Sequence, residues 1–151
     1  MAKPRCFISY AWESNEHKNW VRTLAERLVE SGVETSLDQW DIELGSDIPE
    51  YMETCVRESD FVILICSPTF AAKANTGKGG VGYEKHIVTG EIYQGVASPK
   101  KFVPLLRRGT PEESLPSYLK TKYYIDFRKE NEFEFKFEDL LRHMYHSPKY
   151  K

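Results

Sequence analysis

The sequence lacks the features that mark membrane-spanning, exported or nucleic-acid-binding chains. No apolar run approaches the roughly 18 residues that a transmembrane helix needs, and residues 1–5 lead directly into a short apolar segment without the pattern of a signal peptide. The 21 Lys and Arg residues nearly balance the 23 Asp and Glu residues and are mixed with them, so no basic patch for nucleic acid is visible. We therefore expect a cytoplasmic protein that binds neither nucleic acid nor a membrane.

Cysteine is also scarce. Cys6, Cys55 and Cys66 are odd in number, have no metal-ligand spacing and fall inside apolar segments, where a thiol behaves as a small hydrophobic group. His143 and His146 lie one turn apart, but no carboxylate or cysteine cluster marks a third ligand. We expect reduced core cysteines, surface histidines and no metal site.

The hydrophobic patterns that are present predict alternating strands and helices in one domain. Strands are expected at residues 5–10, 33–37, 61–66, 102–106 and 123–127, and helices at about 20–29, 47–56, 83–94 and 133–144, with loops at 39–46 and 67–76. This alternation predicts an α/β fold, a flavodoxin-like doubly wound five-stranded parallel sheet in the order 2-1-3-4-5 with helices on both faces. A single domain is expected over 1–151, with its core at about 5–146.

Two strands carry more specific expectations. The run from Phe61 to Cys66 is continuously apolar, as is typical of a central strand covered on both faces. Pro104 lacks an amide proton, and it predicts that the fourth strand lies towards an edge or is irregular.

In a sheet of this kind, ligands bind beyond the carboxyl ends of the strands, at the switch between strands 1 and 3. The residues that follow the first three strands are Ser9, Tyr10, Ala11 and Trp12, then Asp38, Gln39, Trp40 and Asp41, then Ser67 and Pro68. Aromatic faces suit a flat heterocycle and carboxylates suit ribose hydroxyls, so a nucleotide-like ligand fits this edge. Packing within the loops is the alternative for Trp12 and Trp40.

Glu84 is the candidate catalytic residue. It ends a glycine-rich segment that begins at Gly79 and opens a predicted helix. Glycines allow a ligand to approach the backbone closely, and the helix dipole keeps a first-turn carboxylate ionised. In the alternative interpretation, the glycines only form a loop and Glu84 caps its own helix.

The glycines of this segment also match a dinucleotide-binding pattern formally. Gly77, Gly79 and Gly82 have the spacing of G-x-G-x-x-G, but residues 67–76 separate them from the preceding strand. Phe102 stands where the fingerprint needs an acidic residue. The Walker pattern is absent as well, so neither phosphate-binding motif is predicted.

Three segments resemble the Toll/interleukin-1 receptor (TIR) domains, especially those of bacterial immune effectors. Residues 7–12 resemble the first box of the family, residues 37–48 resemble its BB loop, and residues 60–68 resemble its core third strand. The resemblance maps the family's catalytic glutamate onto Glu84. Many members carry a tryptophan four residues earlier; Gly80 stands there in this sequence, and Tyr83 is the candidate substitute.

The resemblance implies an NAD⁺ glycohydrolase that cleaves the nicotinamide–ribose bond and releases nicotinamide with linear or cyclised ADP-ribose, in antiphage defence. NAD⁺ is then the substrate, and no other cofactor is expected. Nicotinamide leaves as a neutral pyridine, so one carboxylate suffices where glycosidases usually need two. The expected substrate-binding residues are Ser9, Tyr10, Ala11, Trp12, Asp38, Trp40, Leu44, Asp47, Gly82 and Tyr83.

The same resemblance leaves open a non-catalytic role, in which the domain is a signalling scaffold that acts by homotypic interaction. Trp40, Ile42 and Leu44 in the BB-loop segment are expected to dock a second copy head to tail. In catalytic relatives a neighbouring copy completes the site, so the two roles are compatible. A sensor domain or a separate sensor protein is the expected trigger.

Overall fold

Five parallel strands form the centre of the molecule in the computed structural model, which describes residues 3–75, 88 and 99–146. The strands are β1 (Arg5–Ser9), β2 (Glu34–Ser36), β3 (Phe61–Cys66), β4 (Phe102–Leu106) and β5 (Ile125–Asp126). Their order is β2-β1-β3-β4-β5, and every neighbouring pair is parallel. The predicted strand order is therefore confirmed, and the fully buried β3 lies at the centre of the sheet.

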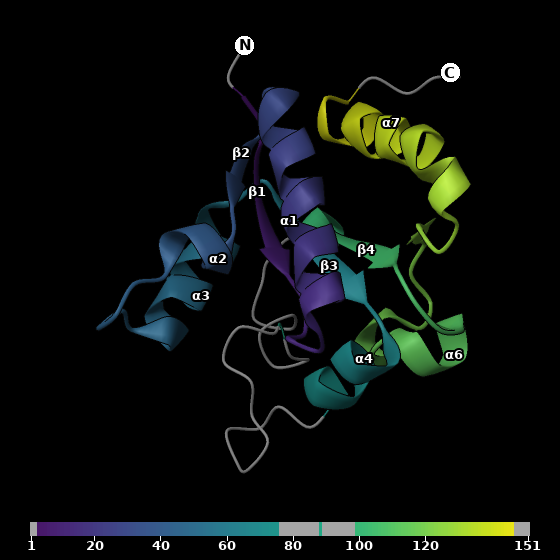
Figure 1. The fold of residues 1–151 in the computed structure, drawn as a ribbon, viewed down its shortest axis with the longest axis horizontal. Helices are drawn as coiled ribbons and strands as arrows, with labels where there is room; N and C mark the ends of the chain where they lie inside the picture. Colours follow the sequence, from purple (N-terminus) through teal and green to yellow (C-terminus); the bar gives the residue numbers. More distant parts are fainter. Residues whose placement is uncertain (1–2, 76–87, 89–98, 147–151) are drawn as a thin grey trace.

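Helices cover both faces of this sheet (Figure 1). They are α1 (Asn15–Glu30), α2 (Asp38–Asp41), α3 (Ile48–Glu58), α4 (Pro68–Asn75), α6 (Pro111–Ser114) and α7 (Phe133–Met144), with 3₁₀ turns at Pro99–Lys101, Ser117–Leu119 and Glu130–Glu132. α1 and α7 pack on one face against alternate residues of β1, β3 and β4. α3 and α4 pack on the other face against the intervening residues. The doubly wound arrangement is thus confirmed.

The boundaries of the longer helices follow from local sequence. Ser14 precedes α1, and its hydroxyl accepts a hydrogen bond from the His17 backbone amide. Asp47 caps α3 in the same way, because its Oδ1 accepts from the Glu50 amide at 3.0 Å. Gly32 follows α1 with a φ of 90°, a left-handed conformation that glycine adopts without steric cost.

Two helices occupy segments predicted as loops. α4 begins directly after Ser67, whose hydroxyl accepts a hydrogen bond from the Phe70 amide and caps the helix. Its apolar side, which includes Phe70 and Ala74, is buried against the sheet. α2 is a single turn, too short to show a helical period in the sequence.

Pro104 lies in β4, which is the strand next to the edge strand β5, so the prediction that this strand lies towards an edge agrees with the structure. Pro104 pairs with Leu64 of β3, whereas β5 pairs only with Leu105 and Leu106. Pro104 therefore lies just before the part of β4 that has neighbours on both sides, where a missing amide proton is tolerated.

The predicted helix at 83–94 lies outside the described residues, apart from Val88, which the structure does not place in a helix. Among the helices described, none has the length and apolar character needed to cross a membrane.

Candidate functional site

The carboxyl ends of β1 and β2 bring three of the predicted site residues together. The indole Nε1 of Trp12 donates a hydrogen bond to Asp38 Oδ2 at 2.8 Å. The Tyr10 hydroxyl accepts a hydrogen bond from Gln39 Nε2 at 2.9 Å, and the Tyr10 side chain is buried. Burial, followed by the nearby Asp38 charge, raises the pKa of Tyr10 well above its usual range, so the phenol is neutral at pH 7.

Trp12 offers an exposed aromatic surface beside this hydrogen bond. Its side chain is 50% exposed although its indole nitrogen is held by Asp38. The Lys18 ammonium lies 5.3 Å from the centre of the Trp12 ring. Asp38 itself is buried, and its Oδ1 has no hydrogen-bond partner among the described residues. The pair therefore presents an exposed aromatic face that is held from beneath by a buried carboxylate.

Ser9 connects the end of β1 to the segment that follows Glu84. Its hydroxyl accepts a hydrogen bond from the Val88 amide at 3.1 Å. The Tyr118 hydroxyl donates to the Val88 carbonyl at 2.5 Å. Both backbone polar groups of Val88 are thus held, and its side chain is buried among residues of β3, α3 and α4. Val88 is fixed at the carboxyl edge of the sheet.

The other predicted site residues lie in different surroundings. Ala11 is buried in the hydrophobic core, and Asp47 caps α3 from the surface. Trp40 and Leu44 lie on the segment from α2 to α3, where Trp40 is 41% exposed and Leu44 is fully exposed. Gly82, Tyr83 and Glu84 lie outside the described residues.

The sequence did not predict a polar cluster that lies between β1, α1, β3 and β4. Ser67 donates a hydrogen bond to Glu13 Oε2 at 2.6 Å, which ties the ends of β3 and β1 together. The same Glu13 oxygen lies 3.7 Å from Nε2 of the fully buried His17. The signal for this cluster was the strand-end position of Ser67, which the sequence does show. Its partner Glu13 comes just before α1 and carries no motif.

Burial determines the charge state of this cluster. Burial lowers the pKa of His17 more than the Glu13 charge raises it, and the Arg107 guanidinium lowers it further. The His17 ring is therefore neutral at pH 7, and its approach to Glu13 is not an ion pair. Arg107 is also buried: it donates to Glu16 Oε1 at 3.0 Å and stacks over the Trp20 ring. This contact anchors the end of β4 to α1.

These features define a class of protein: a flavodoxin-like α/β domain whose aromatic and acidic side chains gather at the carboxyl edge, next to the switch between β1 and β3. The TIR domain family model matches residues 6–141. The chain belongs to the TIR domain family.

Solved structures support this assignment. A prokaryotic SEFIR domain is 37% identical to this chain with a TM-score of 0.83, and the match covers 99% of this chain and 97% of that one. The TIR domain of the Toll-related receptor TRR-2 from Hydra magnipapillata shares the fold at 21% identity and a TM-score of 0.65, covering 93% and 97%. The TIR domains of the activated Roq1 resistosome, which recognises the effector XopQ, share the fold at 16% identity and a TM-score of 0.68. That match covers 94% of this chain and 99% of the other. No curated protein matches the sequence.

Proposed function

We propose that this TIR domain is an NAD⁺ glycohydrolase of the bacterial immune-effector type, with Glu84 as its catalytic carboxylate. The 37% identity to a prokaryotic domain over nearly the whole of both chains supports the bacterial comparison. NAD⁺ is the substrate, and activity rises when copies self-associate under the control of a sensor domain or sensor protein.

The single observation that carries the proposal is the anchoring of Val88 by Ser9 and Tyr118. Glu84 lies four positions before Val88 in the sequence, and four residues of chain span at most roughly 14 Å. The anchor would then keep Glu84 within that reach of the edge where Trp12 and Asp38 meet. Ser9 and Tyr118 would act as positioning residues, because they contact the Val88 backbone and not the substrate.

The described groups suit the parts of NAD⁺ next to the scissile bond. The exposed Trp12 ring offers a face for a flat heterocycle, and its hydrogen bond to the buried Asp38 holds that face in place. In the reaction, the bond between ribose C1′ and the pyridine nitrogen breaks, and nicotinamide leaves with the electron pair. Glu84 would stabilise the oxocarbenium charge that develops on the ribose. Water adding at C1′ gives ADP-ribose and a proton, whereas an internal nucleophile gives the cyclised product.

The proposal is tested with Glu84→Gln. The amide is nearly isosteric but carries no charge, so NAD⁺ cleavage should fall at least ~10²-fold, as when other electrostatic stabilisers are removed. Products are resolved by chromatography after concentrated protein is incubated with NAD⁺. Glu53→Gln removes an exposed carboxylate on α3 and should retain full activity. Retained turnover in a folded Glu84→Gln protein would reject the assignment.

The anchor is tested in the same assay. Tyr118→Phe keeps the ring and removes the hydrogen bond to Val88, so kcat should fall while KM changes little. A Tyr118→Phe protein with unchanged kcat would show that the Val88 anchor does not position the catalytic residue.

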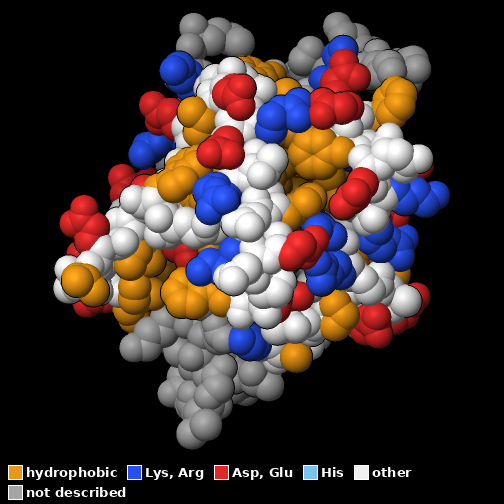
Figure 2. Space-filling view, viewed as in Figure 1, with side chains coloured by type: hydrophobic (Ala, Val, Ile, Leu, Met, Phe, Trp, Pro, Cys, Tyr) orange, Lys and Arg blue, Asp and Glu red, His pale blue; other side chains and the backbone are white. Residues whose placement is uncertain are grey.

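A second function is favoured by one specific observation, the full exposure of Leu44 on the BB-loop segment. An aliphatic side chain at the tip of a projecting loop suits a contact with another TIR domain. Figure 2 shows hydrophobic atoms on the projection formed by the α2–α3 segment. In this alternative the domain is a scaffold that acts by homotypic interaction. Neither the wild type nor the Glu84→Gln variant would then cleave NAD⁺, and the variant would assemble like the wild type.

A further inference from the structure

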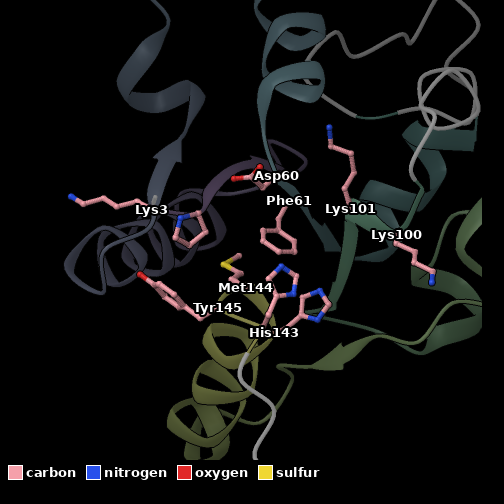
Figure 3. Close-up of a pocket in the computed structure, with 10 residues that line it drawn as sticks. Lys3, Asp60, Phe61, Lys100, Lys101, His143, Met144 and Tyr145 are labelled. Carbon is pink, nitrogen blue, oxygen red and sulfur yellow. The ribbon is translucent and has the colours of Figure 1, made fainter. Parts of the chain in front are cut away.

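A second hollow lies at the opposite edge of the sheet from the candidate site. It has a volume of about 670 Å³, which falls within the range of small-molecule sites. Asp60 and Phe61 at the start of β3, Lys100 and Lys101 before β4, and the end of α7 contribute to its lining. Figure 3 shows Phe61, Met144 and His143 at its centre, with the lysines around them and their ammonium ends directed outwards. The flexible side chains of Lys3 and Lys100 would turn inwards to reach a ligand.

Positive side chains dominate this lining. Lys3, Lys100 and Lys101 carry three positive charges, whereas Asp60 is the one acidic residue among the described lining residues. Asp60 Oδ2 already accepts a hydrogen bond from the Arg5 amide at 3.0 Å. The formal charge of the whole chain is −2, so the hollow is locally positive on a protein that is negative overall.

Two histidines add a titratable component to the lining. The His143 and His146 rings lie 5.3 and 6.0 Å from the Phe61 ring, measured between centroids. Burial and the neighbouring His146 charge lower the pKa of His143. An anion in the hollow would offset this repulsion and favour protonation of His143.

The backbone conformation at His146 gives an independent reason to assign a binding role to its imidazole. His146 follows the end of α7 with a φ of 52°, a left-handed conformation that favours glycine at this position. An L-residue adopts it at a cost of about 1 kcal/mol. Here that conformation accompanies an imidazole ring placed against Phe61, at the wall of the hollow.

We propose that this hollow binds a small phosphate-bearing anion, held by Lys3, Lys100, His143 and His146 over the apolar floor of Phe61 and Met144. Ammonium groups and protonated imidazoles donate charge-assisted hydrogen bonds to phosphate oxygens. A concave hollow of this volume suits a small molecule rather than a flat membrane surface or an extended acidic peptide. The inference is independent of the NAD⁺ proposal, because it concerns the opposite edge of the sheet.

The test follows the histidine rings by NMR while inorganic pyrophosphate is added to the full chain. Saturable shifts are expected at His143 and His146, and the buried His17 serves as an internal control that should not respond. Bound pyrophosphate should raise the pKa of the His143 ring by about 0.5 or more, which corresponds to about 0.7 kcal/mol of coupling. Binding should therefore be tighter at pH 6 than at pH 8.

Two double variants decide whether the hollow is responsible. Lys3→Gln with Lys100→Gln changes exposed side chains at its rim and should weaken pyrophosphate binding at least ~5-fold. Lys122→Gln with Lys129→Gln makes the same change of net charge at exposed positions outside the lining and should leave Kd within about twofold. Equal weakening by both double variants, no shift at His143 and His146, or binding of an acidic peptide without binding of pyrophosphate would each overturn the proposal.

Discussion

His17 is fully buried at the start of α1, and neither ring nitrogen has a hydrogen-bond partner among the described residues. The charged groups that face it are Glu13 on one side and Arg107 on the other. Burial lowers its pKa, so the native state holds the neutral ring, whereas the unfolded chain takes up a proton near pH 6.5. The folded protein therefore loses stability from this residue as the pH falls below about 6.5.

We predict that His17→Leu reduces this loss. The free energy of unfolding is measured with urea between pH 8 and pH 5. Below about pH 6.5 it should fall more steeply for the wild type than for His17→Leu, and the two slopes should differ by up to about 1.4 kcal/mol per pH unit. Leucine is expected to be nearly neutral at pH 8, because it replaces a buried polar group that makes no hydrogen bond. Parallel pH profiles for the two proteins would contradict the assignment of a neutral, buried His17.

At the residue scale, the sequence predicted the meeting of Trp12 and Asp38, because parallel strands end at a common edge. It did not predict the hydrogen bond between Glu13 and Ser67, since that contact depends on side-chain conformations that no spacing rule encodes. The anchor at Val88 was missed for a different reason. Val88 takes part through its backbone amide and carbonyl, so its apolar side chain gives no signal of the role.

The connection from β4 to α6 shows how one element depends on a single glycine. Gly109 has a φ of 78°, and a Cβ there would lie 2.5 Å from the Ser114 hydroxyl oxygen. That hydroxyl donates to the Arg108 carbonyl at 2.6 Å. Thr110 and Glu113 follow with a reciprocal capping box at the start of α6. The turn and the helix it begins are therefore closely packed.

Gly109→Ala and Gly45→Ala form a matched pair that separates two costs of adding a Cβ: backbone strain at positive φ, and a clash with neighbouring atoms. Gly45 has a φ of 91°, and no atom lies within 4 Å of the position that a Cβ would take, so alanine there should cost only the backbone strain of about 1 kcal/mol. Gly109→Ala adds the clash with Ser114 and should cost about 2–3 kcal/mol or more. Urea unfolding measures both. Equal losses would show that the β4–α6 turn relaxes around the new side chain.

At the element scale, length decided what could be predicted. The six buried residues of β3 and the repeating apolar side of α1 gave clear patterns, and both elements were predicted. α2 has four residues and α4 has eight, and a single residue separates each from the end of the preceding strand, where a strand-end loop was the simpler expectation. β5 is shorter than its apolar sequence suggested, because only Ile125 and Asp126 pair with β4.

For the whole molecule, the exposed hydrophobic side chains on the α2–α3 segment bear on assembly. Trp40 and Leu44 are exposed there, while charged groups of both signs are interspersed over the rest of the face in Figure 2. A head-to-tail contact that buries such side chains leaves a free surface at each end and propagates unless it closes into a ring. Under the proposed function, activity and oligomer length should therefore change together.

We predict that specific NAD⁺-cleaving activity rises with protein concentration and that Leu44→Asp and Trp40→Ala suppress this rise. A charge at Leu44 would have to be desolvated in the contact, so Leu44→Asp should reduce the assembled fraction at least ~10-fold. Light scattering and the NAD⁺ assay are run on the same samples across a hundredfold dilution.

Tyr123→Asp is the control for this experiment, because Tyr123 is 97% exposed and lies outside the α2–α3 segment. It should leave both assembly and activity unchanged. Constant specific activity with a monomeric protein at every concentration would instead mean that one chain contains the complete site.

Both edge strands of the sheet are short, with three residues in β2 and two in β5. Each edge therefore offers few backbone amides and carbonyls to a strand from another molecule. Copies that associate at high local concentration have little opportunity to extend one another's sheets into cross-β fibrils. Under the proposed function, filaments of this domain should accordingly dissolve on dilution and fail to bind amyloid dyes, so that assembly would be reversible.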